Sequence, residues 1–358
     1  MSKTEQFRID SHKLNLHPGR VSRWLEGQDI APIYIEISSS GACNHRCRFC
    51  SLDFMGYQKR FLDTEILKGK LKDLGRLGVK SIMYAGDGEP LMHEDMPELT
   101  VATKEAGIDA AFTTNGVFLT PERAEVMLPH TSWIKVSFNA GLPETYGRIH
   151  GARPGDYQKV MDNLAQAVRL REKLGSACTL GFQMVLLPEN QSEAVHLAKT
   201  VRDIGADYLV IKPHSVHPKS GKAEAYKNLT YSDCQILAEE LAALDSPSFK
   251  TVFRREAMIR RDSGQASYDR CLALPFWAYV DGGGGVWTCS RHMGEDEFYC
   301  GNLMEDPVEK IFGPARQAKM AACAASLDIS DCHTDCRMDP INAYLWELKH
   351  PGPHINFI

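Results

Sequence analysis

The 358-residue sequence lacks any long apolar run. The longest, from Cys271 to Val280, has about ten residues and is interrupted by Pro275, whereas a membrane-spanning helix needs about 20. The first ten residues, MSKTEQFRID, also lack the apolar core of a secretory signal. We therefore expect no membrane association and a cytoplasmic location, where thiols stay reduced.

An excess of positive charge is missing as well. The sequence has 41 Lys and Arg against 46 Asp and Glu, a formal net charge of −5. Such a balance gives no basic surface for nucleic acid or for anionic lipid. The contents of 43% apolar and 24% charged residues are those of an ordinary globular protein, and the length favours about two domains.

Cysteine, by contrast, is present in an unusual pattern. The chain has eleven cysteines, an odd number, and is too long to need a disulfide scaffold. Three fall within 43–50 and six within 271–336, whereas Cys178 and Cys234 stand alone and are expected to be buried free thiols. Clustered cysteines in a reducing compartment indicate metal ligands or catalytic groups.

Strand-like and helix-like segments alternate along the first two thirds of the chain. The expected strands are 33–39, 79–85, 110–114, 133–138, 179–187 and 208–212, and the expected helices between them are 63–77, 96–106, 121–128, 155–174 and 192–204. Alternation of this kind predicts an α/β fold with a parallel sheet and right-handed crossovers. Six units are fewer than the eight of a closed barrel, so we expect a partial (β/α)6 barrel.

The alternation of strand-like and helix-like segments ends after residue 212. Four glycines at Gly282–Gly285 lie between two apolar runs and predict a β-hairpin. The expected organisation is an N-terminal extension (1–30), a barrel (31–230), a linker helix with a small cysteine-rich domain (231–340), and a C-terminal helix and tail (341–358).

The first cysteine group is Cys43, Cys47 and Cys50, a C-x3-C-x2-C spacing directly after the first expected strand. Soft thiolates select zinc, copper(I) or iron–sulfur clusters. Three cysteines can bind three irons of a 4Fe–4S cluster and leave the fourth iron open. The alternative is a zinc site whose fourth ligand is His45 or a distant residue.

This spacing, with Phe49 before the last cysteine, resembles that of the radical S-adenosylmethionine (SAM) superfamily. Three further motifs follow in the family's order, each at the end of an expected strand. They are Gly86-Asp87-Gly88-Glu89-Pro90, similar to GGEP but departing at Asp87; Thr114-Asn115-Gly116, which matches TNG; and Ser137-Phe138-Asn139, similar to S-x-D with Asn139 in place of the acid. The resemblance covers about residues 33–213 and makes the zinc site the weaker alternative.

The resemblance implies two cofactors, S-adenosylmethionine and a catalytic 4Fe–4S cluster. It implies that Gly86, Asp87, Gly88 and Glu89 lie near the amino group of S-adenosylmethionine, Ser137 and Asn139 near its carboxylate or ribose, Phe49 beside its adenine, and Asn115 also in the cofactor site. One electron, from a flavodoxin- or ferredoxin-type donor, then cleaves the sulfonium. The resulting 5′-deoxyadenosyl radical abstracts a hydrogen from the substrate.

The second cysteine group lies near the C-terminus. The expected ligands are Cys271, Cys289, Cys332 and Cys336. Their spacing resembles the Twitch domain, a short form of the SPASM domain, and implies one auxiliary 4Fe–4S cluster. Cys300 and Cys323 are surplus, and either could replace one of the four. A zinc knuckle is the alternative.

The substrate is expected over the strand ends, between the barrel and the small domain. The candidate catalytic residues are Gln183 in the fifth strand, Lys212 at the end of the sixth, and His214 just beyond it. A lysine at a buried strand end is costly unless it meets an anion or a polar ligand. A solvated helix face is the favoured interpretation of Arg254, Arg255, Arg260 and Arg261, and a clamp for a carboxylate or phosphate is the alternative.

About 30 residues precede the first expected strand, too few for a leader-binding domain of the usual size. We therefore expect a sugar, aminocyclitol or nucleotide-sugar substrate, in the manner of the family's aminocyclitol dehydrogenases and sugar-nucleotide decarboxylases of antibiotic biosynthesis. Hydrogen abstraction would lead to oxidation or to redox-neutral decarboxylation or elimination. The alternative is a peptide-modifying enzyme that forms thioether or C–C bonds. The sequence carries no signal for a particular oligomeric state.

Overall fold

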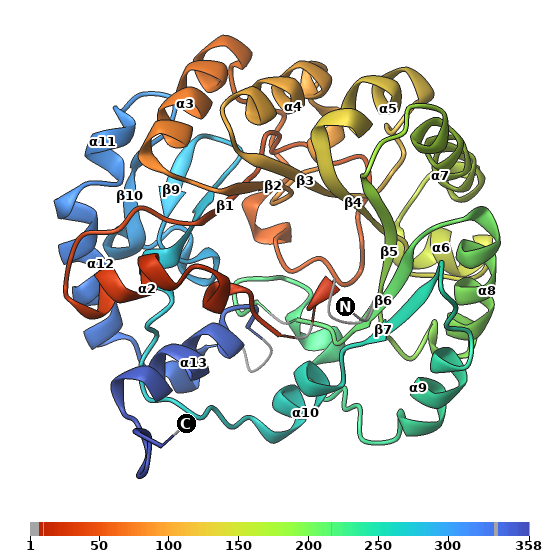
Figure 1. Ribbon diagram of the computed structural model, residues 1–358. Helices are drawn as coiled ribbons and strands as arrows, with labels where there is room; N and C mark the ends of the chain where they lie inside the picture. The colour runs from red at the N-terminus through yellow and green to blue at the C-terminus, as the bar shows by residue number, and fades with distance from the viewer. Residues whose placement is uncertain (1–6, 10, 216, 333–335, 358) are drawn as a thin grey trace.

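The computed structural model describes residues 7–9, 11–215, 217–332 and 336–357. Within these residues the strands form one curved sheet with helices around its outer side, as Figure 1 shows. The strands, in sheet order, are β10 (Tyr299–Asn302), β9 (Gly285–Trp287), β8 (Trp277–Val280), β1 (Tyr34–Ile37), β2 (Ser81–Tyr84), β3 (Asp109–Thr114), β4 (Thr131–Ser137), β5 (Thr179–Val185), β6 (Tyr208–Lys212) and β7 (Lys250–Phe253).

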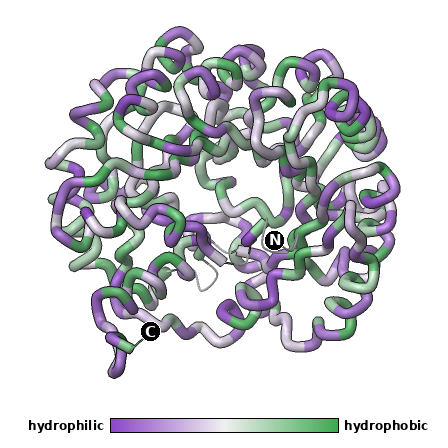
Figure 2. The backbone as a smooth tube through the Cα atoms, viewed as in Figure 1, coloured by the Kyte–Doolittle hydropathy of each residue, from purple (hydrophilic) through white to green (hydrophobic). Residues whose placement is uncertain are grey.

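The α-helices lie before, between and after the strands along the chain. They are α2 (Pro18–Leu25), α3 (Thr64–Leu77), α4 (Met96–Glu105), α5 (Pro121–Met127), α6 (Pro143–His150), α7 (Asp156–Lys173), α8 (Ala194–Ile204), α9 (Gln235–Ala242), α10 (Arg255–Ser263), α11 (Val308–Ile311), α12 (Pro314–Ser326) and α13 (Asp339–Lys349). In Figure 2, hydrophilic and hydrophobic stretches alternate along the outer helices, as expected of helices with one face on a sheet and one in solvent. None of the described helices has the length and apolarity needed to cross a membrane.

Side chains on the strands alternate between the helix side and the inner face of the sheet. On β1, Ile35 and Ile37 are fully buried in the main core, under the helices, so Tyr34 and Glu36 take the opposite, inner face. The same alternation puts polar residues on the inner face of the other strands. They include Thr113 on β3, Lys135 and Ser137 on β4, Gln183 on β5 and Lys212 on β6. The interior of the partial barrel is thus available for chemistry.

Local sequence explains the helix boundaries. The Asp63 carboxylate accepts a hydrogen bond from the Ile66 amide at 2.9 Å and so caps α3. Gly78 ends this helix with a φ of 98°, a conformation that favours glycine. Leu67 and Leu71, four residues apart, are buried on one face. The expected helix at 63–77 is confirmed.

The six expected parallel strands are present, and the chain adds a seventh, β7, which pairs with β6. The sequence of β7, KTVF, is only half-buried and too short to show alternation. The linker helix expected after residue 230 is α9, and β7 follows it in the chain. The parallel sheet thus continues past residue 230, and the division into domains expected from the sequence stays a prediction.

The glycine-rich hairpin is also present, as β8 and β9, with Tyr279 opposite Trp287. The sheet does not break between the two expected domains, because β8 pairs in parallel with β1. Tyr34 lies opposite Trp277 in this pairing. The cysteine-rich region therefore extends the barrel sheet at its β1 edge.

Candidate functional site

The loop after β1 carries Cys43, Cys47 and Cys50, all half-buried and free of disulfides. Burial, followed by the charge of Glu89, raises the pKa of the Cys43 thiol to about 12. Burial raises the pKa of Cys47 well above its usual range, and the charges of Cys50 and Cys43 act in the same direction. The three thiols therefore lie near one another, and a cationic metal centre among them would favour their thiolates. This donor set fits a cluster with thiolate ligands.

The end of α6 holds the centre of this loop. The Arg46 amide donates to the His150 carbonyl at 2.9 Å. The Arg48 amide donates to the Ile149 carbonyl at 2.8 Å. Cys47 lies between these two contacts, so its position is fixed relative to α6.

The segment after β6 contacts the other side of the loop. Lys222 Nζ donates to the Cys47 carbonyl at 2.6 Å, and Ser220 Oγ donates to the Cys50 carbonyl at 3.1 Å. Sequence reasoning missed both residues, because a polar loop 170 residues away gives no sign of its partner.

The motif loop after β2 packs against the segment that leads into Cys43. Gly86 has a φ of 122°, and a Cβ on it would lie 2.5 Å from Ser38 Cβ. A Cβ on Gly88 would lie 2.0 Å from the Ser40 carbonyl oxygen. Only glycine permits this approach at either position. The two expected cofactor-site glycines therefore set how closely the second motif meets the cysteine loop.

Glu89 is buried where this loop meets the end of β3. Its carboxylate accepts hydrogen bonds from the amides of Leu91 and Asn115, at 3.0 and 2.7 Å, and from the Thr114 hydroxyl. Burial raises the pKa of Glu89 to about 7, although these hydrogen bonds favour the ionised form. A neighbouring ammonium group would lower the pKa again and so favour the ionised carboxylate of Glu89. The geometry thus fits the expected role of Glu89 beside an amino group.

Asp87, the departure from GGEP, faces a different partner. Its carboxylate accepts from the Gly282 amide at 3.1 Å and lies 3.5 Å from the Tyr279 hydroxyl. Arg60 adds an ion pair at 3.9 Å. These contacts tie the second motif to the β8–β9 hairpin. They give Asp87 a structural role, and the cofactor contact expected from the motif stays a prediction.

The third motif braces the cysteine loop directly. Asn115 Nδ2 donates to Asn44 Oδ1 at 2.7 Å, and Asn44 follows Cys43 in the sequence. Asn115 Oδ1 accepts from the Val117 amide at 3.0 Å, which closes the turn. Asn115 therefore lies beside the cysteine loop, and its place in a cofactor site stays a prediction.

The fourth motif joins β4 to β5. Asn139 is fully buried, and its Oδ1 accepts from the Val185 amide at 2.6 Å. Its Nδ2 donates to Ser137 Oγ at 3.2 Å. Asn139 thus fixes the orientation of the half-buried Ser137, which is the better placed of the two for a cofactor contact.

Phe49 packs in a small apolar cluster with Ile149 and Val185. Its ring meets the His150 ring edge-on, with centroids 5.7 Å apart. The residue therefore lies at the end of β5, on the side of the barrel where the motifs gather.

The candidate substrate residues lie at the same end of the barrel. Gln183 pairs with Ser137, and Lys212 pairs with Val185, so both face the interior near the carboxyl ends of the strands. His214 is buried two residues beyond β6, with its ring 5.0 Å from that of Tyr226. The structure brings Ser137, Gln183 and Lys212 onto one surface.

Lys135 is a feature of this interior that sequence reasoning missed. Its ammonium lies over the Trp133 ring, 5.4 Å from the centroid. Burial, together with the charges of Lys212, Arg337 and Arg254, lowers the pKa of Lys135 to about 7 against the opposing charge of Glu36. Glu36 is itself ion-paired with Arg337. Cations therefore predominate around Lys135. The polar position in an otherwise apolar strand, Trp133–Val136, was the available signal.

The second cysteine group also comes together. Burial raises the pKa of Cys289 well above its usual range. The charges of Cys336, Cys271 and Cys332 raise it as well. Asn342 Nδ2 donates to Cys271 Sγ at 3.6 Å. The four expected ligands thus lie near one another, in a donor set that fits a second cluster or a tetrahedral ion.

The two surplus cysteines have other neighbours. Burial raises the pKa of Cys300, and the charge of Arg316 opposes this rise most strongly. Cys323 is buried, and its thiol donates to the Glu297 carbonyl at 3.2 Å. These contacts favour the original four cysteines over a set that includes Cys300 or Cys323.

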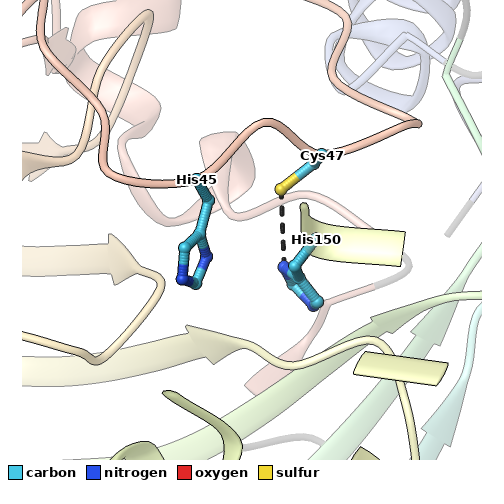
Figure 3. Close-up of side chains that lie close together, drawn as sticks. All are labelled: His45, Cys47 and His150. Atoms are coloured by element: carbon cyan, nitrogen blue, oxygen red, sulfur yellow. Dashed lines mark hydrogen bonds between the residues drawn. The ribbon is translucent and has the colours of Figure 1, made fainter. Parts of the chain in front are cut away.

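One further group lies beside the catalytic loop. His45, Cys47 and His150 each offer a ligand atom, and these atoms lie within 4.8 Å of one another (Figure 3). His45 Nε2 is 3.0 Å from an Asp156 carboxylate oxygen. His150 Nδ1 is 3.4 Å from Cys47 Sγ. This geometry would suit a single ion if all three ligand atoms carried lone pairs.

Residues 37–201 match the family model of the Radical SAM superfamily. Among curated proteins, the chain is 30% identical over 182 residues to a GTP 3′,8-cyclase of Aquifex aeolicus, covering 48% of this chain and 53% of that protein. The chain spans about half the length of the curated relatives it matches.

Among solved structures, the chain resembles Streptococcus suis SuiB bound to S-adenosylmethionine, with a TM-score of 0.63 and 16% identity over 84% of this chain and 70% of SuiB. It also resembles native anSMEcpe with bound AdoMet and the Cp18Cys peptide, with a TM-score of 0.54 and 15% identity over 87% of this chain and 88% of anSMEcpe. At these identities the likeness shows the fold, and it confirms the partial barrel.

Proposed function

The chain carries a radical SAM domain, whose cofactors are S-adenosylmethionine and a 4Fe–4S cluster, and from this premise we propose that it starts radical chemistry on an anionic small molecule containing a sugar. A nucleotide or a nucleotide-sugar meets this description. The cytoplasmic location and the flavodoxin- or ferredoxin-type electron donor belong to the same proposal.

Cys43, Cys47 and Cys50 would hold the catalytic cluster, since they are three free thiols on one braced loop. Glu89 would receive the amino group of S-adenosylmethionine, and Ser137 its carboxylate or ribose. Phe49 and its apolar neighbours would cover the adenine. When bound, the two cofactors supply a 5′-deoxyadenosyl radical that abstracts a hydrogen from the substrate.

Cys271, Cys289, Cys332 and Cys336 would hold one auxiliary 4Fe–4S cluster, which makes the region of 231–340 a Twitch- or SPASM-like unit. The mutual influence of these four thiols supports this assignment. The unit shares the barrel sheet, so the cluster would lie beside the β1 edge.

The substrate proposal depends on one observation, the cations around Lys135. Lys135, Lys212 and Arg254 influence one another inside the barrel, where solvent screens little. A phosphate or carboxylate would be stabilised there, whereas the ammonium groups of an aminocyclitol would be repelled. The curated relatives include GTP 3′,8-cyclases, whose named substrate is a nucleotide, and this supports the nucleotide class.

Two types of reaction are compatible with these residues. Loss of a substrate hydrogen can lead to oxidation, which would make the enzyme an oxidoreductase, or to redox-neutral decarboxylation or elimination, which would make it a lyase. Gln183 and Lys212, on the inner face, would orient the substrate carbon toward the site of hydrogen abstraction. His214 lies at the same end and completes the set of proposed substrate residues.

Deuterium transfer tests the proposal. The reconstituted enzyme is incubated with S-adenosylmethionine, a reductant and deuterated candidates from four classes: nucleotide, nucleotide-sugar, aminocyclitol and peptide. We expect deuterium in 5′-deoxyadenosine only with a nucleotide or nucleotide-sugar. Transfer from the peptide alone would favour a peptide-modifying enzyme. Bound zinc without release of 5′-deoxyadenosine would exclude radical chemistry altogether.

A further inference from the structure

His150, the last residue of α6, lies against the catalytic cysteine loop and takes no part in the function proposed above. Its side chain is 1% exposed, and its two ring nitrogens face different neighbours. Nδ1 is 3.4 Å from Cys47 Sγ, and the dashed line in Figure 3 marks this contact. Nε2 is 3.1 Å from the backbone nitrogen of Asn139.

The partner of Nε2 determines where the ring proton lies. A backbone N–H can only donate, so Nε2 must accept from Asn139 with its lone pair. Asn139 Nδ2, 3.3 Å away, is a second group at the same atom. A neutral imidazole carries one proton, and with Nε2 accepting, that proton is on Nδ1. The N–H therefore points at the sulfur of Cys47.

The surroundings hold the ring in this orientation. The His150 ring stacks on Tyr146, with centroids 4.3 Å apart, and meets Phe49 edge-on. Its carbonyl accepts from the Arg46 amide, one residue before Cys47. The ring and the thiol thus belong to two segments that are hydrogen-bonded to each other.

We propose that His150 donates an N–H···S hydrogen bond to Cys47 and thereby raises the reduction potential of the 4Fe–4S cluster that Cys47 ligates. The inference rests on the proposed function for the presence of that cluster. One-electron reduction of a cluster bound there would add a negative charge, part of which the cysteine sulfurs would carry. A hydrogen-bond donor at one of those sulfurs stabilises the reduced form more than the oxidised form.

The same geometry excludes His150 from a single-ion site with His45 and Cys47. A metal ligand needs a lone pair at Nδ1, which would move the ring proton to Nε2. Nε2–H would then face the Asn139 amide, donor against donor, at 3.1 Å. His150 is therefore a positioning and tuning residue that acts through Cys47.

Three substitutions separate the two ring nitrogens. His150→Phe keeps the aromatic packing but removes both. His150→Gln keeps an acceptor for Asn139 and removes the donor to Cys47. His150→Asn places an N–H near the position of Nδ1. His130→Phe, at the opposite end of β4, is the matched control.

The readout is an EPR-monitored redox titration of the reconstituted holoenzyme, with the catalytic signal identified by its loss in Cys43→Ala. We expect the ratio of reduced to oxidised cluster at a fixed potential to fall about tenfold in His150→Phe and His150→Gln, a shift of about 59 mV for a one-electron couple. His150→Asn should recover most of the shift, and His130→Phe should show none. Wild-type potentials in both the Phe and Gln variants, at full iron content, would overturn the proposal.

A second measurement needs no variant. In wild-type protein labelled with 15N-histidine, pulsed EPR of the reduced catalytic cluster should show one histidine nitrogen and one exchangeable proton coupled to it. Absence of both couplings would refute the hydrogen bond even if every His150 variant failed to fold. Iron analysis keeps the two proposals apart, because a protein without the catalytic cluster contradicts the proposed function, whereas a normal cluster without these couplings contradicts only the role of His150.

Discussion

The two cysteine sites of this chain are built in different ways. Cys43, Cys47 and Cys50 come from one loop of eight residues, whereas the other four come from segments between 271 and 336. The first site exists as soon as its loop is braced by its neighbours. The second requires the β8–β9 hairpin and the segment before α13 to be in place together. A cluster at the first site would therefore contribute little to the stability of the rest of the fold. A cluster at the second site would also hold distant segments of the chain together.

The largest effect is expected at the local site. Replacing Cys43, Cys47 and Cys50 together by Ala should abolish release of 5′-deoxyadenosine and reduce the iron content from about eight to about four per chain. The fold should persist, because the loop is also held by α6 and by Lys222. Iron analysis and product chromatography measure both effects. Cys178→Ala, at a buried thiol outside both groups, is the control, and retained turnover in the triple variant would refute the assignment.

At the assembled site, the double change of Cys271 and Cys289 to Ala should also remove about half the iron, but it should leave S-adenosylmethionine cleavage intact. Because binding energy at such a site is folding energy, Tm should fall by about 5–10 °C. Cys300→Ala is the matched control and should keep all the iron. An unchanged Tm after loss of the second cluster would contradict the idea that this site holds its segments together.

Lys135 tests the inner face of the sheet, which both cysteine groups share with the barrel. Lys135→Met should raise the KM for an anionic substrate about 10- to 100-fold, as expected for loss of one charge-assisted contact of about 1.5–3 kcal/mol. Lys104 is exposed, so Lys104→Met should leave the KM unchanged. Steady-state kinetics measures the difference, and a KM unchanged by Lys135→Met would remove the main support for an anionic substrate.

The same lysine predicts a pH dependence of stability. Its pKa is about 7 in the folded protein and about 10.5 when unfolded, so the unfolded state binds more protons between these values. Its contribution to the free energy of unfolding therefore rises from pH 7 toward pH 10.5 and is lost as the pH falls through 7. Denaturant titrations of wild type and Lys135→Met should diverge with this sign. A reversed or absent divergence would mean that the ammonium is not desolvated.

The smallest effect is expected where the loop after β2 contacts the β8–β9 hairpin. Asp87→Gly restores the residue of the family motif but leaves the buried Gly282 amide without its acceptor. We expect a loss of about 1–2 kcal/mol in the free energy of unfolding, with turnover and iron content close to wild type. Asp87→Asn, which keeps an acceptor oxygen, should recover much of that loss. A large loss of turnover in Asp87→Gly would instead favour the cofactor contact expected from the motif.

Much of this architecture could be predicted because its signals are local. Alternation of apolar residues and capping residues marked the six strands and the helices between them. The cysteine spacing and the three strand-end motifs identified the site loops. The resemblance to the Twitch domain pointed to four C-terminal cysteines, and the structure brings these four together.

What the sequence could not show depends on distant partners or weak local signals. The α6 helix, PETYGRIH, is short and contains Gly147, which lowers helix propensity. The pairing of β8 with β1 joins residues about 240 positions apart, which no local pattern encodes. His150 could be recognised as a neighbour of Cys47 only when α6 was placed against the cysteine loop.

The pairing of β1 with β8 also has a consequence for biosynthesis. Until β8 leaves the ribosome, β1 has a partner on one side only, in β2, and its other edge is open. At 5–20 residues per second, the roughly 240 residues between the two strands take about 12–48 s to translate. An open strand edge is a template for pairing with other chains during that time. Slow synthesis of this protein, or truncation before Trp277, should therefore promote aggregation even though the catalytic loop is already complete.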